Sequence, residues 1–220
     1  FADKNSTMIQ VLTGDGIGAG VLDNGHIFFG SNGIAGQFGH MSLNVHGPRC
    51  ACGNYGCLEL YCTTFSLARC AKEELHHHPE SVLNRHPTIT YTDVFDGMEK
   101  GDGYCIDLIK QLGFYLGCGV VNLINAYDPR YIILSGVLAQ RGSELLLTTV
   151  RHTVKQRILP EFYKMVDIVY SELPVYSVLL GAAAIATSKL IEHPNLLLDT
   201  KEQVMKQKES FPPAGFDHPK

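Results

Sequence analysis

One short stretch of the sequence, GHMSLNVHGPRCACGNYGCLE at residues 39–59, gathers residue types that bind metal ions. It contains one histidine and three cysteines: His40, Cys50, Cys52 and Cys57. Zinc prefers four ligands in a tetrahedron, and thiolate sulfur and imidazole nitrogen are its usual partners. Glycines between the cysteines allow the chain to turn tightly enough to bring them around one ion. Because four protein ligands leave no open coordination position, the stretch predicts a structural zinc site without a catalytic metal-bound water.

Other readings of the cysteines and histidines stay open at this point. The clustered thiols could be buried free cysteines or a redox pair. Four further cysteines fall on expected helix faces, where a thiol acts as a small apolar core group: Cys62, Cys70, Cys105 and Cys118. The run His76–His78 precedes a proline and is interpreted as the solvated end of a helix.

The composition is that of a soluble globular protein. The 220 residues are 45% hydrophobic and 18% charged, which is enough to bury a core. A net charge of −4 gives no basic face for nucleic acid, so DNA reading is expected from a domain outside this chain. Apolar runs are expected to stay short of the about 20 residues that span a membrane. Seven cysteines, an odd number with three close together, do not fit a secreted disulfide framework, and the predicted compartment is the reducing cytoplasm.

Hydrophobic periodicity predicts helices that alternate with buried strands, which is typical of α/β layers. Strands are expected at 8–14, in a hairpin over 16–33 that turns at Asp23-Asn24-Gly25, at 131–136 and at 167–173. Helices are expected at 57–75, 91–98, 104–125, 144–154 and 177–191, followed by a polar, weakly ordered tail over 192–220. Three glycines in the long helix cost helix propensity and predict close packing against another backbone: Gly113, Gly117 and Gly119.

The stretch at 39–59 closely resembles the signature of the ROK family of repressors, open reading frames and sugar kinases. The family pattern is roughly E-x-G-H followed by G-x-x-C-x-C-G-x-x-G-C-x-E, in which the histidine and the three cysteines bind zinc. The resemblance extends to TGDGIGAGV, YIILSGVLAQ and LLGAAAIA, and it covers about residues 8–191. It implies the actin-like (ribonuclease H-like) sugar kinase fold, in which two α/β lobes enclose a ligand cleft.

By this comparison, residues 1–191 correspond to the C-terminal lobe, with the zinc-binding loop at 40–57 inserted in it. The N-terminal lobe would carry a phosphate loop and a catalytic aspartate, and the repressor branch adds a DNA-binding domain. Both parts are expected to lie outside this chain.

The resemblance also implies three sugar contacts. His40 matches a histidine that is both zinc ligand and sugar contact, and Glu59 matches an acid whose carboxylate accepts sugar hydroxyls. From its position alone, Glu59 could equally be an acid favoured by a helix N-terminus. Gln37 stands where the family has glutamate. Because glutamine keeps one acceptor and loses the charge, affinity for the usual hexoses of the family is expected to change.

The stretch TGDGIGAG at 13–20 resembles the phosphate loop of ROK kinases in an altered form, with Gly14, Asp15, Gly16 and Gly18 as its elements. Asp15 replaces a threonine, and a carboxylate repels a triphosphate unless a metal bridges them. Ala19 replaces a glycine, and SGVLAQ at 135–140 departs from the glycine pair of a nucleotide pocket. These changes argue against phosphoryl transfer.

The sequence therefore predicts the effector-binding and oligomerisation lobe of a sugar-responsive ROK-type transcriptional repressor. The expected effector is a small sugar or sugar phosphate, the expected cofactor a structural Zn²⁺, and the expected assembly a homodimer or tetramer. The alternative is a fragment of a ROK kinase that phosphorylates a hexose or an N-acetylated hexose. A third reading is a protein-interaction module in which a partner docks on the zinc loop.

Overall fold

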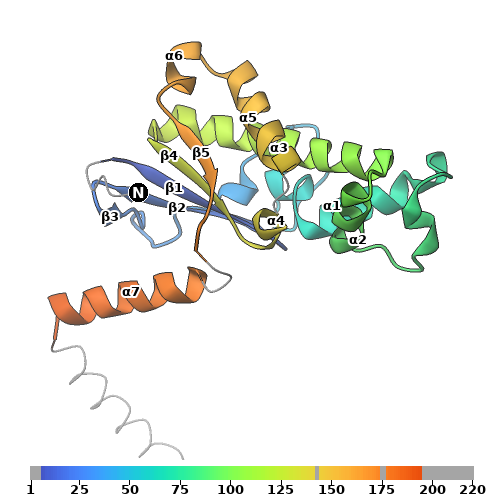
Figure 1. Cartoon of the computed structure of the whole chain (residues 1–220). Coiled ribbons are helices and arrows are strands. Elements are labelled where there is room, and N and C mark those ends of the chain that lie inside the picture. Colours follow the sequence, from blue (N-terminus) through green and yellow to red (C-terminus); the bar gives the residue numbers. More distant parts are fainter. Residues whose placement is uncertain (1–5, 142–143, 174–176, 195–220) are drawn as a thin grey trace, which may run out of the picture. The chain divides into compact units, whose positions relative to one another are not determined.

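The computed structural model describes residues 6–141, 144–173 and 177–194, in two compact units that divide between Glu172 and Leu173. The first unit is built on a sheet of the order β3-β2-β1-β4-β5 (Figure 1). Its strands are β1 (Met8–Thr13), β2 (Ile17–Asp23), β3 (His26–Ile27), β4 (Tyr131–Ser135) and β5 (Asp167–Tyr170). Strands β1 to β3 form an antiparallel meander, whereas β4 and β5 run parallel to β1. The predicted α/β layers and the predicted hairpin are confirmed.

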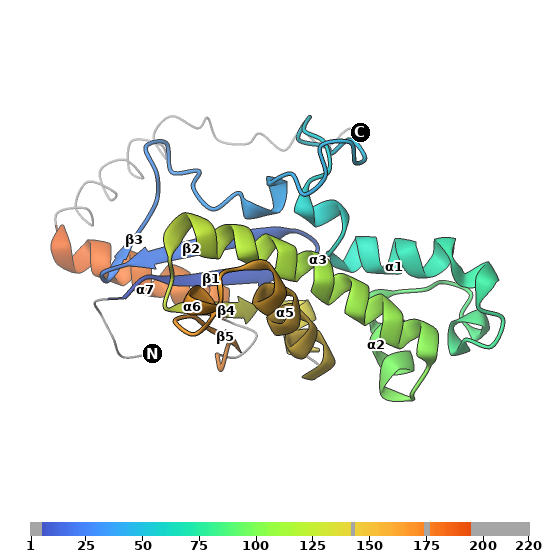
Figure 2. The same ribbon diagram turned by 90° about the horizontal axis from the view of Figure 1, so that it is seen from above.

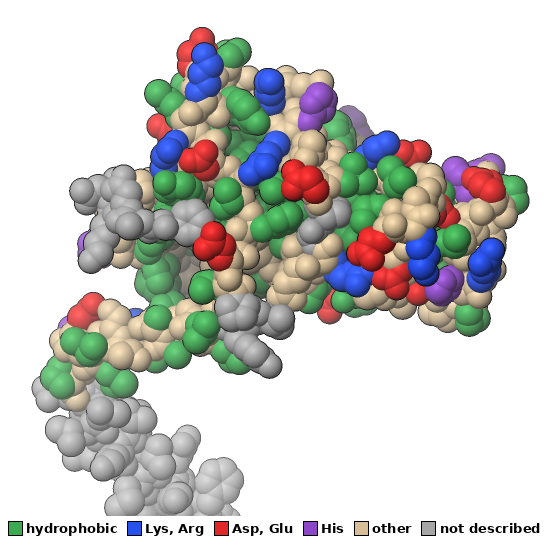
Figure 3. All heavy atoms as spheres, in the orientation of Figure 1, with side chains coloured by type: hydrophobic (Ala, Val, Ile, Leu, Met, Phe, Trp, Pro, Cys, Tyr) green, Lys and Arg blue, Asp and Glu red, His purple; other side chains and the backbone are tan. Residues whose placement is uncertain are grey.

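The helices and helical turns of the first unit connect these strands. The α-helices are α1 (Thr64–Glu73), α2 (Tyr91–Glu99), α3 (Gly103–Tyr127), α4 (Val137–Gln140), α5 (Glu144–Arg157) and α6 (Pro160–Tyr163). The 3-10 turns are η1 (Phe38–His40), η2 (Leu58–Leu60), η3 (Leu75–His77) and η4 (Val82–Arg85). The second unit contains α7 (Ser177–Glu192), an apolar helix with exposed hydrophobic side chains (Figure 3). Most of the predicted tail lies outside the described residues.

The core lies between the sheet and the long helix α3, and Figure 2 shows α3 and α5 side by side over the strands. Alternate residues of β1 and β4 are buried, as a sheet with one face against helices requires: Ile9, Val11, Ile132 and Leu134. A Cβ atom on Gly113 or Gly117 would lie 2.9 or 2.7 Å from the Cβ atom of a threonine on α5. The predicted close packing at these two glycines is therefore confirmed.

The helix predicted over 57–75 is wrong at its beginning. Leu58–Leu60 forms the short turn η2, and α1 starts at Thr64. The start is fixed by a capping box, in which Thr63 Oγ1 accepts from Ser66 N at 3.2 Å and Ser66 Oγ accepts from Thr63 N at 2.7 Å. The predicted strands 131–136 and 167–173 also end earlier, at Ser135 and Tyr170.

Helix α3 is long and apolar enough to cross a membrane by length and composition, contrary to the expectation from the sequence. In the first unit, 61% of its most apolar window is buried, as in the core helix of a soluble protein.

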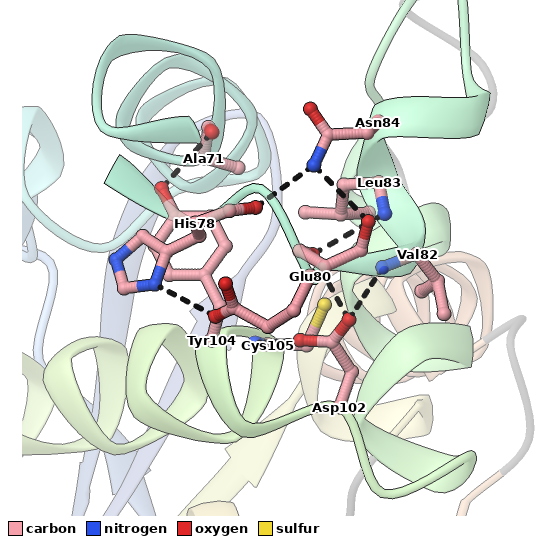
Figure 4. A network of polar contacts seen from close by, with 10 residues as sticks. Ala71, His78, Glu80, Val82, Leu83, Asn84, Asp102, Tyr104 and Cys105 are labelled. Atoms are coloured by element: carbon pink, nitrogen blue, oxygen red, sulfur yellow. Dashed lines mark hydrogen bonds and ion pairs between the residues drawn. The ribbon is translucent and has the colours of Figure 1, made fainter. Parts of the chain in front are cut away.

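The carboxylate of Asp102 joins the start of α3 to the turn η4 (Figure 4). Its Oδ2 accepts hydrogen bonds from Ser81 Oγ at 2.9 Å and Val82 N at 2.7 Å, and its Oδ1 accepts one from Cys105 N at 3.0 Å. Burial favours the neutral carboxyl, but these hydrogen bonds outweigh it, and the pKa of Asp102 is lowered.

We expect Asp102→Asn to lower the free energy of unfolding by about 1–3 kcal/mol at pH 7. The carboxylate accepts from three donors with two oxygens, whereas the amide of asparagine has only one acceptor oxygen. Since the folded-state pKa is below the unfolded value of about 3.9, the stabilisation is complete above that value. It is lost as the pH falls through the folded-state pKa, so the difference between wild type and variant should shrink at pH 3. Urea unfolding at both pH values measures this.

Asp107→Asn on the same helix is the matched control, since Asp107 is exposed and pairs with Lys110 at 3.2 Å across one turn. It should change stability by less than about 0.5 kcal/mol. An equal loss of stability for both variants would contradict a specific role for Asp102.

Candidate metal centre

The loop between η1 and η2 folds back on itself and brings the four predicted metal ligands together. Isolated β-bridges join Ser42 to Cys57 and Arg49 to Tyr55, so the two arms of the loop run side by side. Gly56 has a φ of +60°, and a Cβ atom there would lie 1.8 Å from the carbonyl oxygen of Asn44. A glycine is therefore required where the returning arm crosses the outgoing one.

The ligand atoms of the four residues all lie within 4.8 Å of one another: those of His40, Cys50, Cys52 and Cys57. The Sγ atoms of Cys52 and Cys57 are 3.7 Å apart, and Cys50 Sγ lies 3.7 Å from His40 Nδ1. A tetrahedral zinc with zinc–sulfur bonds of about 2.3 Å needs ligand atoms about 3.7 Å apart along each edge. The spacing and the donor set therefore fit one tetrahedral ion. The structure brings together all four residues predicted from the sequence.

The thiols of the cluster are electrostatically unequal. Burial raises the pKa of the Cys57 thiol to about 12, and the neighbouring thiols of Cys50 and Cys52 add to the effect. A backbone hydrogen bond from Asn54 lowers the pKa of the exposed Cys52 thiol. Thiolates this close repel one another, and a divalent cation supplies the charge that would hold them together.

Two contacts to the backbone of His40 were not predicted from the sequence. Asn54 Nδ2 donates to the carbonyl oxygen of His40 at 3.2 Å, and Cys57 Sγ approaches the same oxygen at 3.4 Å. These contacts hold the His40 backbone against the returning arm. The position of Asn54 between two ligand cysteines was the available signal, since asparagine side chains often bond nearby backbone groups.

Glu59 lies at the edge of the cluster. Its Oε1 is 3.2 Å from His40 Nδ1 and accepts from Cys50 Sγ at 3.2 Å. Glu59 sits in η2, before the Thr63 cap of α1, so it is not an acid of the first turn of α1. Glu59 also lines an open cavity of about 330 Å³ together with residues of α1 that include Phe65 and Arg69. One carboxylate thus borders both the metal cluster and a cavity.

The third residue of the predicted sugar site, Gln37, immediately precedes η1, at whose end His40 lies. Its side chain is exposed, and its carbonyl oxygen accepts from His40 N at 3.1 Å. The turn η1 therefore presents Gln37 and His40 from one short element.

The stretch 13–20, predicted to be an altered phosphate loop, begins at the carboxyl end of β1 and continues into β2. Asp15 Oδ1 accepts from Thr64 Oγ1 at 2.5 Å, which ties the loop to the first residue of α1. A Cβ atom on Gly136, at the end of β4, would lie 2.2 Å from the carbonyl oxygen of Thr13. Ligands of α/β sheets bind at such strand ends. Here an acid occupies the edge, which disfavours a phosphate.

A family profile described as the ROK family matches residues 2–189. The chain belongs to the ROK family. The xylose repressor of Bacillus spizizenii is 30% identical over 192 residues, which cover 87% of this ROK chain and 46% of the repressor. The glucokinase of Halalkalibacterium halodurans is 34% identical over 155 residues, covering 68% of this chain and 47% of the glucokinase. This ROK chain therefore spans less than half the length of these curated relatives.

Solved structures show the same mixture of regulators and kinases. A ROK family glucokinase from Streptomyces griseus, in complex with glucose and AMPPNP, superposes with a TM-score of 0.76 at 26% identity, over 82% of this chain and 60% of the glucokinase. A ROK family transcriptional regulator, a homolog of the Escherichia coli Mlc protein, gives 0.71 at 27% identity, over 77% and 42%. The predicted actin-like sugar kinase fold is confirmed, and relatives of both classes share it.

Proposed function

We propose that this ROK chain is the effector-binding and oligomerisation lobe of a sugar-responsive transcriptional repressor. The observation that carries the proposal is Asp15, which places a carboxylate in the phosphate loop and bonds it to Thr64 at 2.5 Å. Xylose repressors among the relatives support the same reading. A sugar would act by binding one state of the repressor more tightly than another, because equal affinity for both states shifts no population.

The loop at residues 40–57, here called the metal loop, would order the sugar site. We propose that His40, Cys50, Cys52 and Cys57 hold one structural Zn²⁺, which fixes the loop and supplies no reacting group. Glu59 borders both His40 and Cys50, so a fixed ligand set would also fix the surroundings of that carboxylate. Glu59, His40 and Gln37 then form the sugar-binding side chains of this lobe, with the rest of the cleft supplied by the N-terminal lobe. DNA would be read by a separate domain, in a homodimer or tetramer in the cytoplasm.

A fragment of a ROK sugar kinase is the second candidate, favoured by the 34% identity to a glucokinase. Kinase chemistry needs a phosphate loop that accepts the nucleotide and a base for the sugar hydroxyl. A repressor lobe needs the sugar contacts and no phosphate loop. The two candidates therefore differ in what ATP does in the presence of a sugar.

The test is a sugar panel on the complete natural protein: xylose, glucose, N-acetylglucosamine and the 6-phosphates of the two hexoses. We expect calorimetry to detect binding of at least one of these sugars, and mass spectrometry to detect no phosphorylated product with Mg-ATP. Steady ATP-dependent phosphorylation of a hexose would replace the repressor proposal by the kinase. Absence of binding by every sugar, together with a protein partner that protects the loop 41–57, would favour the docking module.

A further inference from the structure

A second cavity, of about 520 Å³, shares no lining residue with the cavity at Glu59. It opens between α3, the C-terminal end of α5 and the first residues of the metal loop. The side chains that matter for its chemistry are Ser42, Phe114, Tyr115, Cys118, Asn122 and Arg157. Its volume is within the range of about 300–1,000 Å³ that is usual for small-molecule sites. Neither the sugar site nor the metal cluster uses these α3 and α5 side chains.

The packing of α3 on α5 explains why Arg157 reaches this cavity. Gly113 of α3 faces Thr149 of α5, and Gly117, one turn later on α3, faces Thr153, one turn later on α5. The two helices therefore run in the same direction at this contact. The next turn of α5 carries Arg157, its last residue. Helical side chains point back toward the N-terminus of their helix, and the guanidinium carbon of Arg157 lies 5.0 Å from the ring centroid of Phe114.

The cavity carries a positive charge without an acid in its lining. Among the described residues, no carboxylate lies within ion-pair distance of Arg157. The amide of Asn122 and the hydroxyl of Tyr115 are neutral. A guanidinium presents a planar pair of donors that matches the two oxygens of a carboxylate.

The rest of the lining is aromatic. The ring of Phe114 is 40% exposed and meets Tyr115 edge to face, with 5.5 Å between centroids. Tyr115 in turn stacks on Tyr61 at 4.7 Å, which fixes its ring. Such a wall favours a flat apolar body. We propose that this cavity binds a small aromatic carboxylate, with the carboxylate on Arg157 and the ring against Phe114.

The cavity shares a wall with the metal loop, which gives its occupant a route to the loop. Ser42 Oγ donates to the carbonyl oxygen of Tyr55 at 2.7 Å, and Leu43 N donates to that of Gly56 at 2.8 Å. The acceptors belong to Tyr55 and Gly56, the two residues before Cys57. A ligand that packs on Ser42 and Leu43 stabilises the returning arm, and linkage makes the effect reciprocal: an ordered metal loop binds the ligand more tightly.

The experiment uses Cys118, a half-buried thiol in the lining, as a reporter. Alkylation of the complete protein by iodoacetamide is followed for each cysteine by peptide mass spectrometry, with benzoate as the probe. We expect benzoate to slow alkylation of Cys118 in a saturable way and to leave Cys70 on α1 unchanged. Benzamide, which keeps the ring without the charge, and acetate, which keeps the charge without the ring, should each protect at least 10-fold more weakly.

Two variants assign the site. Arg157→Gln should raise the dissociation constant of benzoate at least 10-fold. Lys155→Gln, at the same exposed helix end, should leave it unchanged. Calorimetry with benzoate gives the same comparison if Cys118 reacts slowly. Equal protection by benzamide or acetate, undiminished benzoate binding in Arg157→Gln, or a Cys118 shielded in a dimer regardless of benzoate would each overturn the proposal.

Discussion

Cys57→Ser abolishes stoichiometric zinc binding and lowers the free energy of unfolding by about 4 kcal/mol or more, if the cluster holds a structural ion. Cys57 is fully buried and its Sγ lies 3.7 Å from that of Cys52. Serine keeps the shape, but its hydroxyl does not ionise at neutral pH and is a poor zinc ligand. With three ligands left, the ion no longer joins the two arms of the loop, and only the hydrogen bonds between the arms remain.

The measurement combines metal analysis of protein purified with zinc, urea unfolding, and limited proteolysis of residues 41–57. Wild type should contain one zinc per chain and resist cleavage in the loop, whereas the variant should do neither. A chelator should give wild type the unfolding curve of the variant. Such agreement would separate the effect of the ion from that of the buried side chain.

Cys70→Ser is the matched control, since Cys70 is a half-buried thiol on α1 outside the cluster. It should keep one zinc and lose no more than about 1 kcal/mol. Wild-type protein that contains no zinc after growth in zinc, or a Cys57→Ser protein that retains one equivalent, would contradict the structural ion and leave the cluster as free thiols beside His40.

The cluster of four candidate metal ligands could be predicted because its information is local. His40 and the cysteines lie close in sequence, and glycines mark the turns between them. The break between η2 and α1 was not predicted, because Leu58 continues the hydrophobic period of the helix that follows. Its backbone N instead donates to the carbonyl oxygen of Met41 at 2.9 Å, which ties this turn to the metal loop. A tertiary contact therefore overrides a correct periodicity.

The residue pairs that meet in longer-range contacts could not be predicted from the sequence. The hydrogen bond between Asp15 and Thr64 joins residues 49 positions apart, and it gives Asp15 a structural partner on α1. Likewise, the cavity at Arg157 depends on how α3 and α5 align. Sequence reasoning predicted that glycines would allow close packing, but the register of Gly117 against Thr153 came from the structure.

Glu59→Gln is expected to weaken sugar binding by about 10- to 100-fold, because a hydrogen bond to a charged acceptor contributes about 1.5–3 kcal/mol. The amide keeps one acceptor and turns the other oxygen into a donor. It also ends the contact of a carboxylate with His40 Nδ1 at 3.2 Å. The measurement is calorimetry with the sugar found to bind wild type, and metal analysis is repeated on the variant.

Retained zinc with weakened sugar binding would assign Glu59 to the sugar, whereas loss of both would assign it to the support of the metal loop. Glu73→Gln is the control, an exposed carboxylate on α1 whose Oε1 lies 3.6 Å from Arg69 Nη1. The converse change, Gln37→Glu, restores the residue of the family pattern and should tighten binding of hexoses. If Glu59→Gln binds the sugar as tightly as wild type and Gln37→Glu also has no effect, the sugar site does not lie at η1 and η2.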